Sequence, residues 1–195
     1  MLYSDAEGYT MQRRTRFYIA IATMITVAAL ASAEGAGGLL FGVAKPGWNP
    51  NFMPEPQMPA DLEYFGGYGY GISERGNIVG GFGMAIMDYA VDRMAGGAGG
   101  MIVGWRLVRD SFIHVDLVAR LGLGGMAAYS GKGWKGFAIY YVEPLGEIGI
   151  GLTPWMHLSA TLGYQLIGNF VPGKPSSDIF MRSPTLGFTL TWGVF

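Results

Sequence analysis

Several long segments of this sequence alternate apolar residues with small or polar ones at a period of two. In residues 112–128, Ile113, Val115 and Leu117 share one face, while His114 and Asp116 share the other. Residues 155–168 and 185–195 alternate in the same way. Because successive side chains of a β-strand point to opposite faces, the pattern predicts strands with one apolar face each.

We predict eight antiparallel strands. Ten is the alternative count, because Pro144 falls inside one of the predicted strands and proline has no N–H for the backbone hydrogen bonds of a sheet. These strands are long for a soluble protein and match the length that a membrane-crossing strand needs. The predicted strands cover residues 37–44, 62–72, 78–88, 99–108, 112–128, 136–151, 155–168 and 185–195.

The connections between these strands alternate in length. Short connections are predicted at 73–77, 109–111 and 152–154, and the connections at 45–61, 89–98, 129–135 and 169–184 are longer. An outer-membrane barrel has long loops on the outside and short turns on the periplasmic side, whereas a β-sandwich gives no reason for such alternation. The pattern therefore favours an all-β, antiparallel up-and-down β-barrel.

Two glycine motifs give the sequence a family resemblance. It contains Gly66-Gly67-Tyr68-Gly69 and ends in Gly193-Val194-Phe195. In these motifs it resembles a glycine-rich exported group, and in the strands and alternating connections of residues 34–195 it resembles small eight-stranded bacterial outer-membrane proteins. The resemblance implies recognition by the barrel-assembly machinery through the strand ending at Phe195, although Phe195 is out of phase with the apolar face of Trp192 and Val194.

Composition restricts the protein class further. Charged residues make up 14% of the chain, against about 25% in soluble domains, so something other than water is expected to face part of the surface. The net charge of −1 provides no basic patch for nucleic acid. The absence of cysteine excludes disulfides, thiolate metal sites and an acylated N-terminal cysteine.

The first part of the chain has the features of a secretory leader. Arg13, Arg14 and Arg16 precede the uncharged run 17–30, and Ala31-Ser32-Ala33 forms a small-x-small site. These features predict a cleaved signal helix over residues 1–33, with translation starting at Met11, and a single barrel domain over 34–195. The expected location is the bacterial outer membrane, with its lipid as a partner.

Charged residues on the alternating strands are candidates for a network inside the barrel. Asp116 and Arg120 are too far apart along one strand to pair with each other, so each is expected to pair with a residue of a neighbouring strand. An eight-stranded barrel has room inside only for side chains, which favours ion pairs that fill the interior over a ligand site. The predicted network consists of His114, Asp116, Arg120, Arg106, Glu143 and Glu147.

His157-Leu158-Ser159 places a histidine and a serine on one strand face, where the imidazole could activate the hydroxyl. The spacing is similar to the His-x-Ser of lipid A deacylases, which are also small outer-membrane barrels, but Ala160 follows where that family has asparagine. Packing inside the barrel is the favoured alternative, and the chain is not predicted to be an enzyme.

Tryptophan and tyrosine near strand ends are typical of the aromatic girdles of membrane barrels. The predicted interface aromatics are Trp105, Trp134, Trp155, Trp192 and Tyr164. No cofactor or metal is predicted, because two histidines on different strands and no cysteine make a poor ligand set.

Four functions remain open from the sequence. The first is a structural or surface-interaction barrel that contacts an extracellular ligand through the loops at 45–61 and 169–184. The second is a narrow channel or carrier for small or apolar molecules, which requires a continuous lumen. The third is a lipid-modifying hydrolase that uses His157 and Ser159. The fourth is a soluble periplasmic barrel that binds an apolar ligand, with its tyrosine and leucine faces pointing inward.

Overall fold

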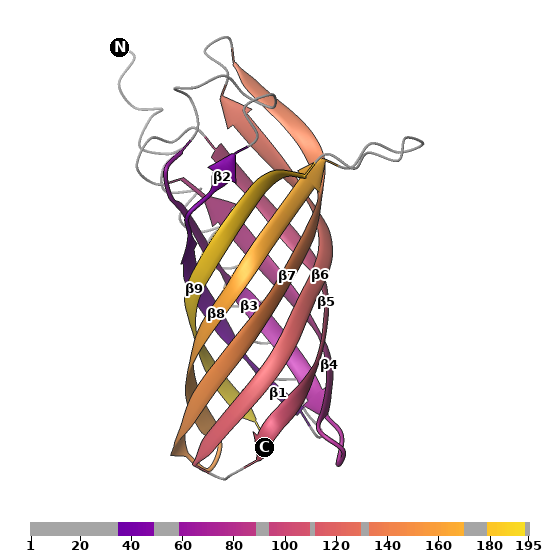
Figure 1. The fold of residues 1–195 in the computed structure, drawn as a ribbon, viewed down its shortest axis with the longest axis vertical. Coiled ribbons are helices and arrows are strands. Elements are labelled where there is room, and N and C mark those ends of the chain that lie inside the picture. The colour runs from indigo at the N-terminus through magenta and orange to yellow at the C-terminus, as the bar shows by residue number, and fades with distance from the viewer. Residues whose placement is uncertain are drawn as a thin grey trace, which may run out of the picture.

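The alternating segments of the sequence form the strands of one antiparallel sheet (Figure 1). The computed structural model describes residues 35–48, 59–88, 94–109, 112–129, 133–169 and 179–193. Within these ranges the strands are β1 (Gly35–Ala44), β2 (Gly47–Trp48), β3 (Leu62–Ile72), β4 (Asn77–Met87), β5 (Met94–Arg109), β6 (Ile113–Tyr129), β7 (Trp134–Thr153), β8 (Met156–Asn169) and β9 (Ile179–Gly193).

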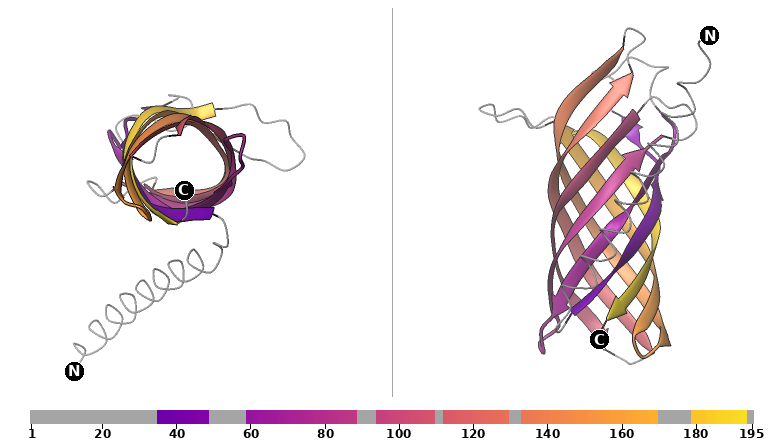
Figure 2. Two further views of the ribbon diagram at one scale, coloured as in Figure 1. Left: turned by 90° about the horizontal axis from the view of Figure 1, so that it is seen from below. Right: turned by 180° about the vertical axis from the view of Figure 1, so that it is seen from behind.

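The sheet closes on itself to form a barrel. Each long strand pairs with the next along the chain, and β1 pairs with β9 from Ala36 opposite Gly193 to Ala44 opposite Thr185. The view along the barrel in Figure 2 shows the closed ring. The prediction of an antiparallel up-and-down barrel of eight strands is confirmed, and the alternative count of ten is wrong. The two-residue β2 is an addition that pairs with β9 at Arg182 and Met181.

Pro144 does not divide its strand, as the alternative count supposed. It lies within β7 and pairs with Ala119 of β6. Pairing between β7 and β8 stops at Val142 and resumes at Leu145 in an unchanged register. Since proline lacks only its own N–H donor, one interruption on one side leaves the remaining ladder intact.

The ends of the strands divide the barrel into two rims. Strands β3, β5, β7 and β9 end at one rim, where β1, β4, β6 and β8 begin and where the short turns 73–76 and 154–155 lie. Strands β1, β4, β6 and β8 end at the other rim, where β3, β5, β7 and β9 begin, and more residues of the sequence separate the strands there. We call these the short-turn rim and the long-connection rim; the short-turn rim is at the bottom of Figure 1.

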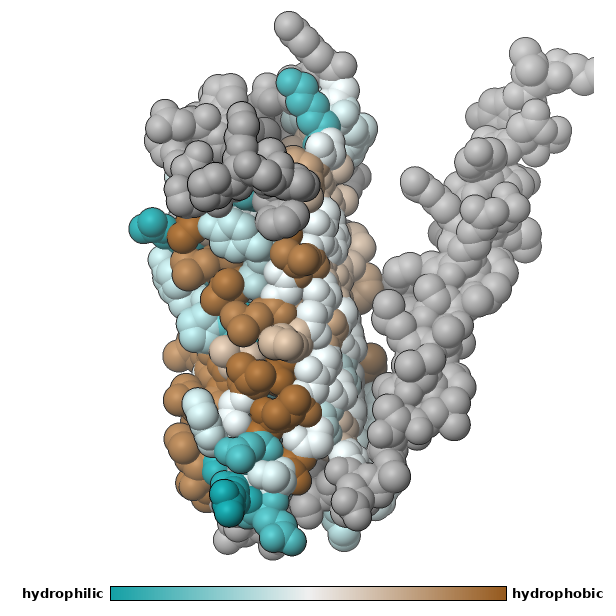
Figure 3. All heavy atoms as spheres, turned by 90° about the vertical axis from the view of Figure 1, so that its right-hand side faces the viewer, coloured by the Kyte–Doolittle hydropathy of each residue, from teal (hydrophilic) through white to brown (hydrophobic). Residues whose placement is uncertain are grey.

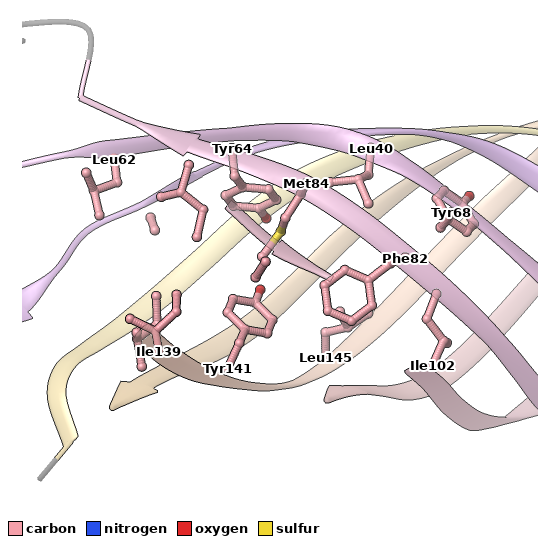
Figure 4. Packing of buried hydrophobic residues seen from close by; sticks show 14 of the residues in the cluster. Leu40, Leu62, Tyr64, Tyr68, Phe82, Met84, Ile102, Ile139, Tyr141 and Leu145 are labelled. Atoms are coloured by element: carbon pink, nitrogen blue, oxygen red, sulfur yellow. The ribbon is translucent and has the colours of Figure 1, made fainter. Parts of the chain in front are cut away.

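Period-two alternation separates the two surfaces of the wall. In β6, Leu117, Leu121 and Leu123 are exposed, whereas Asp116 and Arg120 are buried inside the barrel. β8 and β9 follow the same rule. The tyrosines of β3 are different, because these large side chains are buried inside the barrel, as Figure 4 shows for Tyr64 and Tyr68. The outer surface of the barrel wall is therefore apolar, and its inner surface carries both apolar and polar side chains.

The interior has two regions. Near the long-connection rim it is filled by apolar side chains from β3 to β9, which are the buried residues Leu62, Ile86, Met94, Met126, Ala128, Ile139, Ile167, Phe180 and Met181. Toward the short-turn rim, buried charged and hydroxyl side chains lie among further apolar ones such as Ile78 and Ile102. Figure 4 shows Leu62, Ile139 and Tyr141 pointing into the barrel from opposite walls. No helix in the described ranges is long and apolar enough to cross a membrane.

Candidate functional site

The buried polar residues in the short-turn half of the barrel come from adjacent strands. They occupy alternate positions of their strands, so the pleat turns all of them inward. The set comprises Arg106 of β5, whose side chain is 6% exposed; His114, Asp116 and Arg120 of β6; Glu143 and Glu147 of β7; His157, Ser159 and Thr161 of β8; and Thr185, Thr189 and Thr191 of β9. We call this set the interior polar network.

Two arginine–carboxylate pairs form the framework of the network. Arg106 binds Asp116 with two parallel bonds, from Nε to Oδ1 and from Nη2 to Oδ2, each 2.9 Å long. Arg120 Nη1 donates to Glu143 Oε2 at 2.9 Å. Bidentate arginine–carboxylate contacts are among the strongest polar contacts in proteins. Asp116 and Arg120 therefore each pair across to a neighbouring strand, and all six network residues named from the sequence point into the barrel.

Hydroxyl groups complete the surroundings of Glu143. Tyr141 donates to Glu143 Oε2 at 2.7 Å, and Thr185 donates to Glu143 Oε1 at 2.8 Å. This carboxylate therefore has three donors from three strands. A buried charge that is paired and hydrogen-bonded in this way holds the strands in one register, since a shifted register would leave it without partners.

Glu147 lies in a different environment, because no arginine bonds to it directly. Its Oε1 atom is 3.5 Å from His114 Nε2 and 3.3 Å from Thr189 Oγ1. The same His114 nitrogen is 4.0 Å from Asp116 Oδ2. The His114 ring also stacks on His157, with centroids 5.1 Å apart and planes 22° apart. Two histidines from separate strands thus meet beside two carboxylates.

Ser159 has an imidazole neighbour that the sequence did not suggest. Its Oγ atom is 3.3 Å from Nε2 of His114, two strands away. Gly149 of β7 lies between them, because His114 pairs with Gly149 and Gly149 pairs with Ser159. A Cβ atom at Gly149 would lie within 2.5 Å of Ser159 Oγ and would collide with the His114 ring. In the sequence, the feature that could have indicated this contact was Gly149, which lies on β7 between the strands of His114 and Ser159.

The geometry of His114, Ser159 and Glu147 differs from a hydrolytic triad. A triad uses one imidazole nitrogen for the serine and the other for the carboxylate, so that the proton can pass between them. Here Nε2 contacts both Ser159 and Glu147, while Nδ1 is buried without a hydrogen-bond partner. Ser159 is 1% exposed inside the barrel. The arrangement fits interior packing better than nucleophilic attack on a lipid.

A small cavity adjoins the carboxylates of the network. Its volume is about 10 Å³, which is roughly the room that one water molecule needs. Asp116, Glu147, Arg120 and Tyr70 are among its lining residues. The Nε atom of Arg120 is buried and makes no hydrogen bond.

The aromatic residues predicted for the membrane interfaces lie on the outer wall. Trp105, Trp155 and Trp192 are close to the short-turn rim, where Trp105 and Trp155 are exposed and Trp192 is half-buried. Trp134 is exposed at the long-connection rim, and Tyr164 is exposed on β8. Contact of these residues with lipid remains a prediction.

Some sequence-based predictions concern residues outside the described ranges. These are the signal helix over 1–33 with its start at Met11, the terminal Phe195 as an assembly signal, and most of the loops at 45–61 and 169–184. They stay predictions.

No protein-family model matches the sequence, and no curated protein matches it. Among solved structures, the chain is similar to Ail, the attachment invasion locus protein of Yersinia pestis. The identity is 12%, the match covers 82% of this chain and 99% of Ail, and the TM-score is 0.44. Ail in complex with the heparin analogue sucrose octasulfate gives 13% identity, the same coverage and a TM-score of 0.45. At these values the similarity does not assign the chain to a family.

Proposed function

We propose that this protein is an outer-membrane β-barrel that acts as a closed anchor and makes surface contacts through its long-connection rim. The observation that carries the proposal is the reversal of polarity across the wall. Large apolar side chains such as Leu162, which is 68% exposed, cover the outside, whereas the arginine–carboxylate pairs are inside. A soluble barrel would gain nothing from this arrangement, but a barrel surrounded by lipid requires it.

The distribution along the barrel axis supports the same proposal. Figure 3 shows hydrophobic and near-neutral residues over the middle of the wall, with the most hydrophilic residues toward its two ends. Closure of the sheet pairs the backbone groups of every long strand, which is what a strand needs to cross hydrocarbon. The outward leucines of β6, β8 and β9 weigh against a soluble barrel that binds an apolar ligand.

The filled interior favours an anchor over a channel. Leu62, Ile139, Ile167 and Met181 are 0% exposed and pack across the barrel below the long-connection rim. The polar network fills the other half. An eight-stranded barrel has little interior space to begin with, so side chains of this size close it.

The hairpin of β6 and β7 favours surface contact at the long-connection rim. β7 begins at Trp134, but its pairing with β8 begins only at Ile139. The hairpin thus extends beyond the paired end of β8 (Figure 1). At its tip, Trp134 and Tyr129 are exposed and pack edge to face at 5.9 Å. Exposed aromatics of this kind are enriched at protein-binding surfaces.

Orientation can be tested by labelling single cysteines, because the chain has none of its own. Lys135→Cys places a thiol at the long-connection rim, and Arg75→Cys places one in the turn at the opposite rim. We expect a membrane-impermeant maleimide to label Lys135→Cys on intact cells, and Arg75→Cys only after the outer membrane is permeabilised. Equal labelling on intact cells, or recovery of the protein as a soluble periplasmic species, would contradict the proposal.

The surface role has its own test. Replacing Tyr129 and Trp134 at the tip of the β6–β7 hairpin with serine should reduce adhesion of the producing cells to protein-coated surfaces. The unboiled barrel should still migrate differently from the boiled form on a detergent gel. Unchanged adhesion of this variant would contradict the proposed contact role and leave the anchor role standing.

A further inference from the structure

Three potential metal-ligating atoms converge in the short-turn half of the barrel. Nε2 of His114 and one carboxylate oxygen each of Asp116 and Glu147 lie within 4.8 Å of one another, and all three residues are buried. The sequence argued against a metal because the two histidines are on different strands. The structure indicates a different ligand set, in which His114 of β6 meets carboxylates of β6 and β7 and the second histidine is not a ligand.

The charges of the interior polar network leave one carboxylate without an arginine. Arg106 is bonded to Asp116 and Arg120 to Glu143, so the third carboxylate, Glu147, has no arginine bonded to it and is contacted by His114, Thr189 and Ser159. A buried carboxylate is costly unless a cation or several donors compensate it. The position next to Glu147 is therefore the part of the network where a cation is most favourable.

The spacing of the three atoms suits a metal ion. Zinc bonds to imidazole nitrogen and carboxylate oxygen are about 2.0–2.2 Å long, so ligand atoms around one tetrahedral ion lie roughly 3.4 Å apart. His114 Nε2 is 3.5 Å from Glu147 Oε1 and 4.0 Å from Asp116 Oδ2. The three atoms lie within 4.8 Å of one another, so they would have to close by up to about 1.4 Å to surround one ion.

Neighbouring side chains already hold the two carboxylates in place. Arg106 fixes both oxygens of Asp116, but each oxygen retains a second lone pair. Thr189 donates to the same Glu147 oxygen that faces His114. Partners of this kind behind the ligands orient them and are a regular feature of metal sites in proteins.

A second observation points to an occupant beside the carboxylates. The cavity of about 10 Å³ borders Asp116 and Glu147, and its lining includes Arg120, whose Nε atom is buried without a hydrogen bond. Arg120 is 3% exposed. An unsatisfied buried polar group at a cavity indicates a bound water or ion.

We propose that His114, Asp116 and Glu147 bind one divalent first-row transition metal ion, of which zinc is the best match. One imidazole and two carboxylates, with a remaining position for solvent, form a donor set that suits zinc. The ion would join β6 to β7 inside the barrel and so stabilise the folded state over the unfolded chain.

The test uses the full chain, unfolded in urea with a chelator and refolded in detergent with or without zinc. We expect one zinc ion per chain to remain after gel filtration, and zinc to raise the urea midpoint of unfolding. Refolding with cobalt(II) instead should give the intense visible absorption of a tetrahedral ion. A wild-type chain that refolds, retains no zinc and shows no midpoint shift would overturn the proposal.

His114→Asn and His157→Asn form the matched pair of variants, because the two rings stack on each other but only His114 is a proposed ligand. His114→Asn should weaken zinc binding by more than about 100-fold, while His157→Asn should retain one zinc per chain. If His114→Asn does not refold, Glu147→Gln removes a ligand with little change of shape and should lose zinc likewise. Equal zinc content in wild type, His114→Asn and Glu147→Gln would mean that zinc binds elsewhere, and the site would be wrong.

Discussion

His114 Nε2 and Ser159 Oγ lie 3.3 Å apart although β7 separates their strands in the sheet. The contact exists because the residue between them is Gly149, whose missing side chain leaves space for the imidazole ring. A contact across an intervening strand is available only inside a narrow, strongly curved barrel. Gly149 is therefore one of the positions where interior packing depends on a glycine.

Gly149→Ala should destabilise the barrel by about 1–3 kcal/mol, since the new methyl group overlaps the buried His114 ring and Ser159 and forces them to move. Urea unfolding followed by tryptophan fluorescence measures the change. Gly146→Ala on the same strand is the control, because it faces outward and its Cβ meets nothing within 4 Å. Equal effects of the two substitutions would contradict the interior placement of His114.

Arg120→Met should lower the free energy of unfolding by about 3–5 kcal/mol, because it leaves Glu143 charged, buried and without its arginine. The double variant Arg120→Met with Glu143→Gln should lose less than Arg120→Met alone. A double-mutant cycle by urea denaturation provides the coupling energy. Additive losses would show that the two side chains do not form a buried pair.

Leu162→Arg tests which medium surrounds the wall. Leu162 is 68% exposed in the middle of β8, so in lipid the substitution should cost about 2–4 kcal/mol. Leu152→Arg, at the end of β7 by the short-turn rim, should cost about 0–1 kcal/mol. Unfolding in lipid vesicles measures both. If both substitutions change the free energy of unfolding by less than about 0.5 kcal/mol, the middle of the wall faces water, because changes of that size are usual at exposed sites of soluble proteins.

The variant Ser159→Ala distinguishes a packing role of Ser159 from a catalytic role in hydrolysis. We expect a loss of about 0.5–1.5 kcal/mol in stability, the usual contribution of one hydrogen bond. Lipid A from cells producing the wild type or the variant should give the same mass spectrum, because Ser159 is buried inside the barrel and shares one His114 nitrogen with Glu147. A lipid A species that depends on Ser159 would restore the hydrolase hypothesis.

Most strand positions were predictable from the sequence, because the pleat places alternate side chains on alternate faces. The ends of the strands were less predictable. Strand β5 begins at Met94 and not at the predicted residue 99, and β9 begins at Ile179 and not at the predicted residue 185. Both extensions contain residues that the sequence had placed in loops. They are strands because neighbouring strands supply hydrogen-bond partners there, which no local pattern indicates.

The residues of the polar network were predictable from the sequence, since they lie on the face of each strand opposite its apolar face. The pairs that they form were not predictable. Arg120 could have met Glu147 as easily as Glu143 on sequence grounds. The register of β6 on β7, with Arg120 opposite Glu143, decides the pair. Similarly, the sequence placed Ser159 beside His157, and the curvature of the wall brought His114 to it as well.

The sequence alone determined that the chain forms alternating antiparallel strands and that each strand has one apolar face, because both follow from residue order and pleat geometry. It did not determine which face meets the interior, and β3 illustrates why: its tyrosines point inward, while the leucines of β6 point outward. Only the closed sheet decided this. Closure leaves a narrow interior in which buried charges must find partners on other strands, and the remaining apolar faces are left on the outside.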